Sequence, residues 1–181
     1  MTDIHIQTEA QYAAIYDEAG PANTAGFIET QLDAARQVMD AKETEARLAS
    51  YYLERQLISC ASRGELLAWA LPFNGTFKVA IEYAPPLLQD RNDGLHLEDV
   101  LPHTADLVCP SGRLKISCVS KLGVPLPTAA VSVEPGAYRV SLLRNEQQEA
   151  LHFGLDGSAQ YPATDGPDWI FTLQRLQGQQ R

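Results

Sequence analysis

Residues 106–145 read DLVCPSGRLKISCVSKLGVPLPTAAVSVEPGAYRVSLLRN, and this stretch decides the fold. Apolar and polar residues alternate through residues 113–118 and again through residues 138–142. A period of two residues is typical of strands with one buried and one solvated face. Between the two runs, Glu134-Pro135-Gly136-Ala137 places proline where a turn needs its fixed φ and glycine where a type II turn needs φ > 0. The stretch therefore predicts a sheet core with a sharp corner.

Short apolar runs separated by turn residues continue on both sides of this stretch. They predict strands at residues 66–71, 76–83, 106–109, 113–120, 129–133, 137–144, 149–154 and 168–173. Asn74-Gly75, between the first two strands, predicts a β-hairpin. Ser111-Gly112 predicts the start of another hairpin. Eight short strands with frequent turns indicate an antiparallel sandwich or barrel.

The N-terminal third of the chain has a different pattern. Residues 1–6 predict a short strand, after which Thr8 and Gln11 form a capping-box pattern that predicts a helix through Tyr12 and Tyr16. Residues 24–62 then place apolar residues at helical spacing, which predicts one long helix or two in succession.

These patterns together predict an α+β fold. We expect an N-terminal helical region, residues 1–63, to pack on a C-terminal antiparallel β-sandwich or barrel, residues 64–181, as one compact unit. A chain of 181 residues with 45% hydrophobic residues is long enough to bury one such core.

Charge and cysteine content limit the classes of function. The net charge of −9 argues against nucleic-acid binding, which needs clustered basic residues. It suits a basic protein partner, and the more common alternative is that negative charge simply keeps the protein soluble. Three scattered cysteines without a C-x-x-C pair indicate a reducing compartment. The sequence begins without a signal-peptide pattern and has no apolar run of the roughly 18 residues that a membrane span needs. We therefore expect a cytoplasmic protein without a membrane partner.

No motif names a reaction. The sequence has no G-x-S-x-G elbow and no glycine-rich phosphate loop, so neither a catalytic serine of that kind nor a nucleotide cofactor is predicted. Residues 90–94, DRNDG, have the wrong ligand spacing for a calcium loop and predict a turn. His96 and His103 lie seven residues apart without an H-E-x-x-H motif, so no metal site is predicted. An enzyme that uses His96 or His103 as a base remains an alternative.

Two segments carry a resemblance to a known family. Residues 110–116, PSGRLKI, and residues 133–140, VEPGAYRV, resemble the P-S-G-R-L-x-I and V-x-P-G-x-Y-x-V segments of small acidic bacterial proteins that neutralise polymorphic toxins. The resemblance brings no catalytic residues and does not extend to the N-terminal third. It implies an immunity protein that binds and blocks a toxin, with an acidic surface against a basic active site.

We therefore expect a non-enzymatic, acidic binding protein of the immunity type. A secretion chaperone or adaptor for an exported effector is the alternative within the same class. Residues 1–60 hold ten acidic side chains against four basic ones, which is also the pattern of a solvated helix face. The candidate partner-binding residues are acids of this region and of the long connection at residues 84–104, namely Glu29, Asp33, Asp40, Glu43, Glu45, Asp90, Asp93, Glu98 and Asp99.

The aromatic residues have two interpretations. Trp69 and Trp169 lie in predicted strands, and Tyr51 and Tyr52 lie in a predicted helix, so core packing is expected for all four. Any of them that is exposed beside acids would instead suit an interface hot spot.

Overall fold

The computed structural model describes eight parts of the chain, which are residues 2–8, 12–20, 43–71, 75–83, 101–119, 129–144, 167 and 169–176. Within them the chain forms nine strands and one helix. In chain order these are β1 (Thr2–Thr8), β2 (Tyr12–Asp17), α2 (Glu43–Ser62), β3 (Leu66–Ala70), β4 (Gly75–Tyr83), β5 (Thr104–Cys109), β6 (Arg113–Cys118), β7 (Ala129–Ser132), β8 (Gly136–Arg144) and β9 (Trp169–Arg175).

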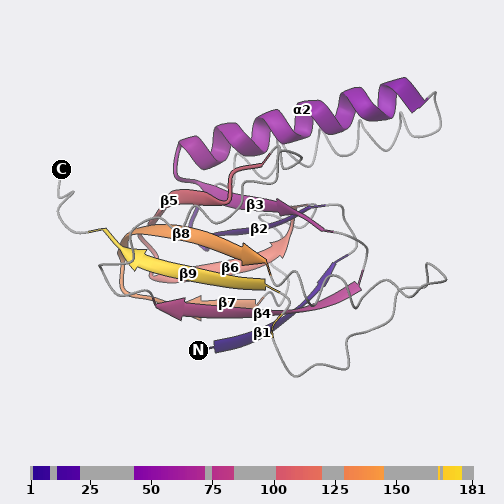
Figure 1. Ribbon diagram of the computed structural model, residues 1–181. Coiled ribbons are helices and arrows are strands. Elements are labelled where there is room, and N and C mark those ends of the chain that lie inside the picture. Colours follow the sequence, from indigo (N-terminus) through magenta and orange to yellow (C-terminus); the bar gives the residue numbers. More distant parts are fainter. Residues whose placement is uncertain are drawn as a thin grey trace.

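The strands form two sheets that pack face to face, with the helix along the outer side of one of them (Figure 1). Sheet A has five strands in the order β1-β4-β9-β8-β5, and sheet B has four in the order β3-β2-β6-β7. β4 and β9 pair in parallel, whereas every other neighbouring pair is antiparallel. The architecture is therefore an open sandwich with α2 as a third layer.

The core lies between the two sheets and is rich in aromatic side chains. Trp69 of β3 meets Phe171 of β9 edge to face, with 4.9 Å between ring centroids, and its centroid lies 6.2 Å from that of Trp169. All three side chains are almost fully buried. Because aromatic rings bury roughly 150–250 Å² each, this cluster supplies a large share of the apolar contact between the sheets.

Strands β2 and β3 of sheet B are buried on both faces. One face of β2 joins the core through Ala13 and Ile15, and the other presents Tyr12, Ala14 and Tyr16 to α2. The helix packs against it with a stripe at helical spacing, formed by Leu53, Leu57, Cys60 and Ala61. The Tyr12 hydroxyl donates a hydrogen bond of 2.7 Å to the Glu54 carboxylate, which ties the helix to the sheet.

A glycine ends α2 and directs the chain into β3. Gly64 has a φ angle of +73°. Its N–H donates to the Ala61 carbonyl oxygen at 3.0 Å, and the Glu65 N–H donates to the Cys60 carbonyl oxygen at 3.0 Å. This is the Schellman pattern, in which a left-handed residue satisfies the last carbonyl groups of a helix.

Two connections that change sheets meet at one end of the sandwich. β5 of sheet A leads into β6 of sheet B through residues 110–112, and β7 of sheet B leads into β8 of sheet A through residues 133–135. The Val133 N–H donates to the Gly112 carbonyl oxygen at 2.9 Å. The Tyr138 hydroxyl donates to the Glu134 carbonyl oxygen at 2.5 Å. The two segments that carry the family resemblance therefore lie against each other.

The buried Asp17 carboxylate fixes the first of these connections to the end of β2. One oxygen accepts hydrogen bonds from the Ser111 hydroxyl at 2.5 Å, the Ser111 N–H at 3.2 Å and the Cys109 thiol at 2.9 Å. The other accepts from the Ala19 N–H at 2.9 Å. A buried carboxylate is costly unless donors surround it, so these contacts are necessary to the fold.

The expected fold class is wrong. The chain begins with two strands, β1 in sheet A and β2 in sheet B, rather than with a helical segment. The capping-box pattern misled the prediction, because β2 is buried on both faces and its YAAIYD sequence lacks the alternation of a half-buried strand. Sheet A also contains a parallel pair, and both sheets are open rather than closed into a barrel.

The predicted turns need correction as well. β3 and β4 lie in different sheets, so Asn74-Gly75 does not connect a hairpin, and neither does Ser111-Gly112 between β5 and β6. Positive φ angles occur at Gly64 and Gly112 within the described residues, and Gly136 has none. The type II turn predicted at residues 134–137 is therefore wrong, and this segment instead connects β7 of sheet B to β8 of sheet A.

Most of the other predicted elements agree with the structure. The short N-terminal strand is confirmed as β1, and seven of the eight later predicted strands correspond to β3 through β9, with ends that differ by one or two residues. Helix α2 confirms the part of the predicted helix at residues 43–62. The strand predicted at residues 149–154 and the helical pattern at residues 24–42 lie outside the described residues.

Replacing Gly112 by alanine should destabilise the fold. Its φ of +69° costs an L-residue about 1–2 kcal/mol, and a Cβ there would lie 2.9 Å from the Val133 carbonyl oxygen. We expect the free energy of unfolding of Gly112→Ala, measured by urea denaturation, to fall by roughly 2–3 kcal/mol.

Gly136→Ala is the matched control. A Cβ at Gly136 would make only ordinary contact, 3.5 Å from Arg175 Nε, and its φ is not positive. This variant should stay within about 1 kcal/mol of the parent protein. Equal losses in the two variants would show that the contact between the two connections does not constrain the fold.

Candidate functional site

The outer side of α2 carries the most exposed aromatic pair in the described part of the chain. Tyr51 and Tyr52 are 48% and 57% exposed, and their rings meet edge to face with centroids 6.0 Å apart. The Arg55 guanidinium lies over the Tyr51 ring, 5.4 Å from its centroid. Because Leu53 and Leu57 face sheet B, this pair points away from the sandwich. We call Tyr51, Tyr52 and Arg55 the α2 face.

The structure places only two of the predicted partner-binding acids. Glu43 and Glu45 lie in the first turn of α2, on the same helix as the α2 face. The others lie outside the described residues, namely Glu29, Asp33, Asp40, Asp90, Asp93, Glu98 and Asp99. The acids therefore remain predictions. The core packing expected of Tyr51 and Tyr52 is wrong, because both are exposed, and the hot spot stays a prediction, since the side chain over the Tyr51 ring is Arg55 rather than an acid. Trp69 and Trp169 are core residues, as the packing interpretation expected.

Ion pairs occupy many of the charged side chains that the structure describes. These pairs are Arg63–Glu65, Arg113–Glu18, Lys115–Glu18, Arg139–Asp106 and Arg175–Glu134.

A second cluster, around Asp17, contains a thiol and a hydroxyl beside a carboxylate. Such groups serve in nucleophilic catalysis only when the nucleophile is easily deprotonated. Burial raises the pKa of the Cys109 thiol to about 12, and the hydrogen bond to Asp17 acts in the same direction. Burial likewise raises the pKa of Cys60 to about 11. Both thiols stay protonated at neutral pH, which suits packing rather than attack on a substrate.

The histidines of the alternative enzyme hypothesis are not brought together in the described residues. His103 directly precedes β5, and its carbonyl oxygen accepts a hydrogen bond of 2.8 Å from the Leu142 N–H. His96 lies outside the described ranges, as do residues 84–100 of the long connection. Across the parts of the chain that the structure describes, no three His, Cys, Asp or Glu side chains form a group that could hold a metal ion.

Helix α2 is too polar to span a bilayer. Among the described residues no helix combines the length and the hydropathy that a membrane crossing requires.

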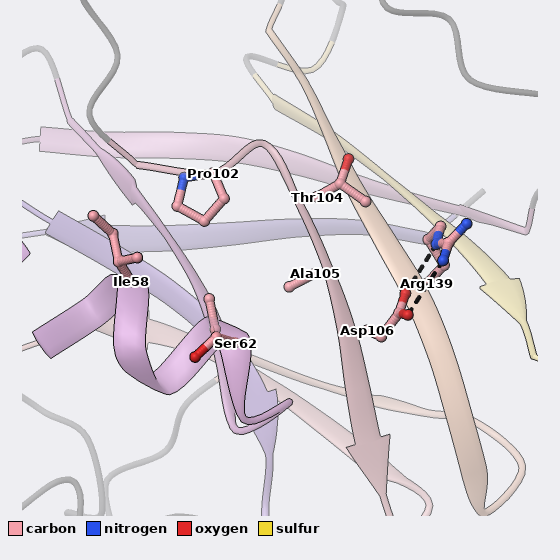
Figure 2. A pocket seen from close by; sticks show the side chains of 8 residues that line it. Ile58, Ser62, Pro102, Thr104, Ala105, Asp106 and Arg139 are labelled. Atoms are coloured by element: carbon pink, nitrogen blue, oxygen red, sulfur yellow. Dashed lines mark hydrogen bonds and ion pairs between the residues drawn. The ribbon is translucent and has the colours of Figure 1, made fainter. Parts of the chain in front are cut away.

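A groove opens between the last turn of α2 and the edge strand β5 (Figure 2). Its volume is about 630 Å³. Apolar side chains and the Asp106–Arg139 ion pair share its lining, which consists of Ile58, Ala61, Ser62, Pro102, Thr104, Ala105, Asp106 and Arg139. Sequence reasoning missed this groove, because its walls come from α2 and β5, which are distant in the chain, and no local pattern connects them.

Comparison with known proteins gives likeness of fold alone. No protein family matches the sequence, and neither does any curated protein. One solved structure, titled "Crocagin biosynthetic gene J", is similar over 98% of this chain and 100% of its own, with a TM-score of 0.50 and 21% identity. A second is ComJ from Bacillus subtilis, titled an inhibitor of the DNA degrading activity of NucA, with a TM-score of 0.43 and 7% identity over 97% of this chain and 96% of its own. Neither likeness carries an argument about the activity of this chain.

The buried Cys109 thiol should make stability depend on pH under alkaline conditions. Because its folded-state pKa is raised, its contribution is complete below the pKa of an unfolded cysteine, roughly 8.5, and is lost as the pH rises toward 12. We expect the urea-measured free energy of unfolding to fall more steeply between about pH 8 and pH 10 in the parent protein than in Cys109→Ala, by up to ~1.4 kcal/mol per pH unit. Equal slopes would mean that the thiol ionises freely in the folded state.

Proposed function

We propose that this chain is a non-enzymatic binding protein of the immunity type, which binds a basic toxin protein and blocks it. The α2 face provides the contact that holds the partner, and the predicted acidic residues attract it. The exposed tyrosine pair on the outer side of α2 is the observation that carries the proposal.

The composition of the α2 face supports a protein contact. Tyrosine and arginine are enriched among the residues that dominate binding energy at interfaces, and tyrosine buries a large area with few rotatable bonds. Two adjacent tyrosines that are about half exposed on a helix contribute nothing to the core of this molecule. Their edge-to-face contact and the Arg55 stack restrict their rotamers before any partner arrives, which lowers the entropic cost of binding.

The net charge of the chain supports a partner of positive charge. The chain carries a net charge of −9, and its acidic residues include nine at positions 29–45 and 90–99. An excess of acidic surface residues raises the association rate with a basic protein by electrostatic steering. An acidic inhibitor in front of a basic active site uses this effect.

The state of the thiols supports the non-enzymatic part of the proposal. The cysteine next to a carboxylate and a serine, Cys109, keeps its proton because burial raises its pKa. Ser111 is committed to Asp17 through both its hydroxyl and its N–H. These groups serve the connection between the sheets.

Replacing the two tyrosines should weaken capture of the partner. The experiment first isolates partners of the tagged protein from its native source at low and high salt, identifies them by mass spectrometry, and measures the affinity and activity of each purified partner. We expect a basic protein whose activity is blocked at a one-to-one ratio. Tyr51→Ala/Tyr52→Ala should raise its dissociation constant by roughly 30-fold or more, mainly through faster dissociation.

Tyr83→Ala is the control for this variant. Tyr83 is 62% exposed at the end of β4, in the sheet that α2 does not cover. Its replacement should leave affinity within about twofold. A captured partner that binds both variants equally well would exclude the α2 face, and a partner whose activity is unaffected by binding would refute the inhibitor function.

Reversing an acid at the start of α2 should slow association. Glu45→Lys places a positive charge on the helix that carries the α2 face, so repulsion should lower the association rate with a basic partner several-fold at low salt, and the salt dependence should flatten. Glu82→Lys is the matched control, because it reverses one charge on β4 of sheet A, which α2 does not cover. Stopped-flow rates that are equal for both variants would show that steering does not involve the N-terminal part of α2.

A further inference from the structure

The edge of β5 faces the groove beside α2 with main-chain groups. Among the strands that the structure describes, β5 is the last of sheet A, and β8 is its partner there. The His103 carbonyl oxygen accepts from Leu142 of β8, whereas the Val108 N–H donates in the other direction, to the Gly64 carbonyl oxygen at 3.1 Å. Because successive residues of a strand direct their N–H and C=O groups to opposite sides, Thr104 and Asp106 also direct theirs away from β8.

Within the described residues, these outward groups are unpaired at one end of the edge and covered by Gly64 at the other. Gly64 closes the end at Val108, where its backbone lies so near β5 that a Cβ would be 2.6 Å from the Asp106 carbonyl oxygen. Among the residues that the structure describes, no backbone group pairs with the N–H or C=O of Thr104 on this side, or with the N–H of Asp106. Two donors and one acceptor therefore face the groove in the spacing of a β-ladder.

The walls of the groove provide room and side-chain contacts beside this edge. Figure 2 shows Ile58 and Ser62 of α2 on one side and Thr104, Ala105 and Asp106 on the other, with Pro102 at one end. The Asp106 carboxylate is held in place by Arg139 through two hydrogen bonds, of 2.9 Å and 3.2 Å. A chain in the groove would meet an apolar wall from the helix and a charged pair on the sheet.

We propose that this groove binds an extended segment of a partner protein, which adds to sheet A as a short strand next to β5. An extended main chain is the ligand whose N–H and C=O groups repeat with the spacing of Thr104 and Asp106. The apolar wall formed by Ile58 and Ala61 suits an apolar side chain of that segment. Gly64 and the last turn of α2 block the far half of the edge, so a single short segment fits better than the edge of a second sheet.

The groove and the α2 face are formed by different residues, so binding of a segment in the groove does not depend on the inhibitor function. A partner segment would be recognised in the same way whatever that partner does. The test therefore uses the full-length chain and a peptide probe, and it does not require that the partner be identified.

The probe is a library of random 12-residue peptides displayed on phage and selected on the full-length protein. Selected peptides are then synthesised and titrated against the parent chain, Ser62→Trp and Ser62→Ala. Ser62 is exposed and lines the groove, so tryptophan fills the groove without disturbing the core, while alanine leaves it open. We expect Ser62→Trp to weaken peptide binding by roughly tenfold or more and Ser62→Ala by less than about twofold.

Amide hydrogen exchange followed by NMR tests the strand geometry directly. In the free protein the amides of Thr104 and Asp106 should exchange much faster than those of Ala105 and Leu107, which face β8. A bound peptide should slow exchange at Asp106 by roughly tenfold or more. The exchange rate at Asp106 stays unchanged if a peptide binds only to an exposed side chain.

Three results would overturn the proposal. The first is failure of the selection to yield peptides that distinguish the parent chain from Ser62→Trp. The second is a peptide that binds without slowing exchange at Asp106. The third is slow exchange at Asp106 in the absence of peptide together with a dimer in analytical ultracentrifugation, which would identify the occupant as a second copy of this chain.

Discussion

A single buried carboxyl group organises one end of the sandwich. Asp17 ends β2 and collects hydrogen bonds from Ala19, Cys109 and Ser111. A polar group in the interior is tolerated only when donors replace its water, so the chain after β5 must pass where it can satisfy Asp17. The connection from β5 to β6 then supports the connection from β7 to β8 through Gly112 and Val133. These two of the crossings between the sheets depend in this way on the end of one strand.

The strands with one buried face were predictable from the sequence, whereas the neighbouring strands with which they pair were not. β5 alternates strictly between exposed and buried residues, and β6 and β8 follow the same pattern closely enough to be recognised. β2 was missed because α2 covers its second face, which removes the alternation. Asn74-Gly75 and Ser111-Gly112 have local turn chemistry, but the sheet that each neighbouring strand joins is decided by contacts far away in sequence. The left-handed conformation occurs at Gly112 rather than at Gly136, and this too depends on which sheets the connected strands join.

The candidate site could be predicted only in part. The sequence showed that residues 51 and 52 are adjacent tyrosines in a helical pattern. Adjacent residues of a helix point about 100° apart, so the sequence alone does not show whether either tyrosine faces the core. That becomes clear only when the buried stripe of the helix is known. Leu53, Leu57 and Cys60 define that stripe through sheet B. The sequence did show the excess of acidic residues, and the structure adds that Glu18 and Asp106 are held in ion pairs. The groove beside β5 combines two distant segments and had no sequence signal.

The order of strands in sheet A has a consequence for the synthesis of this protein. β9, residues 169–175, lies in the middle of the sheet, between β4 and β8, although it is the last strand in the described part of the chain. While the ribosome is still producing residues 145–168, β1 with β4 and β5 with β8 are two separate halves, each with an open edge at the position that β9 will fill. Non-local pairings of this kind form slowly, and open edges are prone to associate with other chains. Until its C-terminal strand is complete, a nascent chain of this protein therefore exposes two strand edges that favour association with other chains.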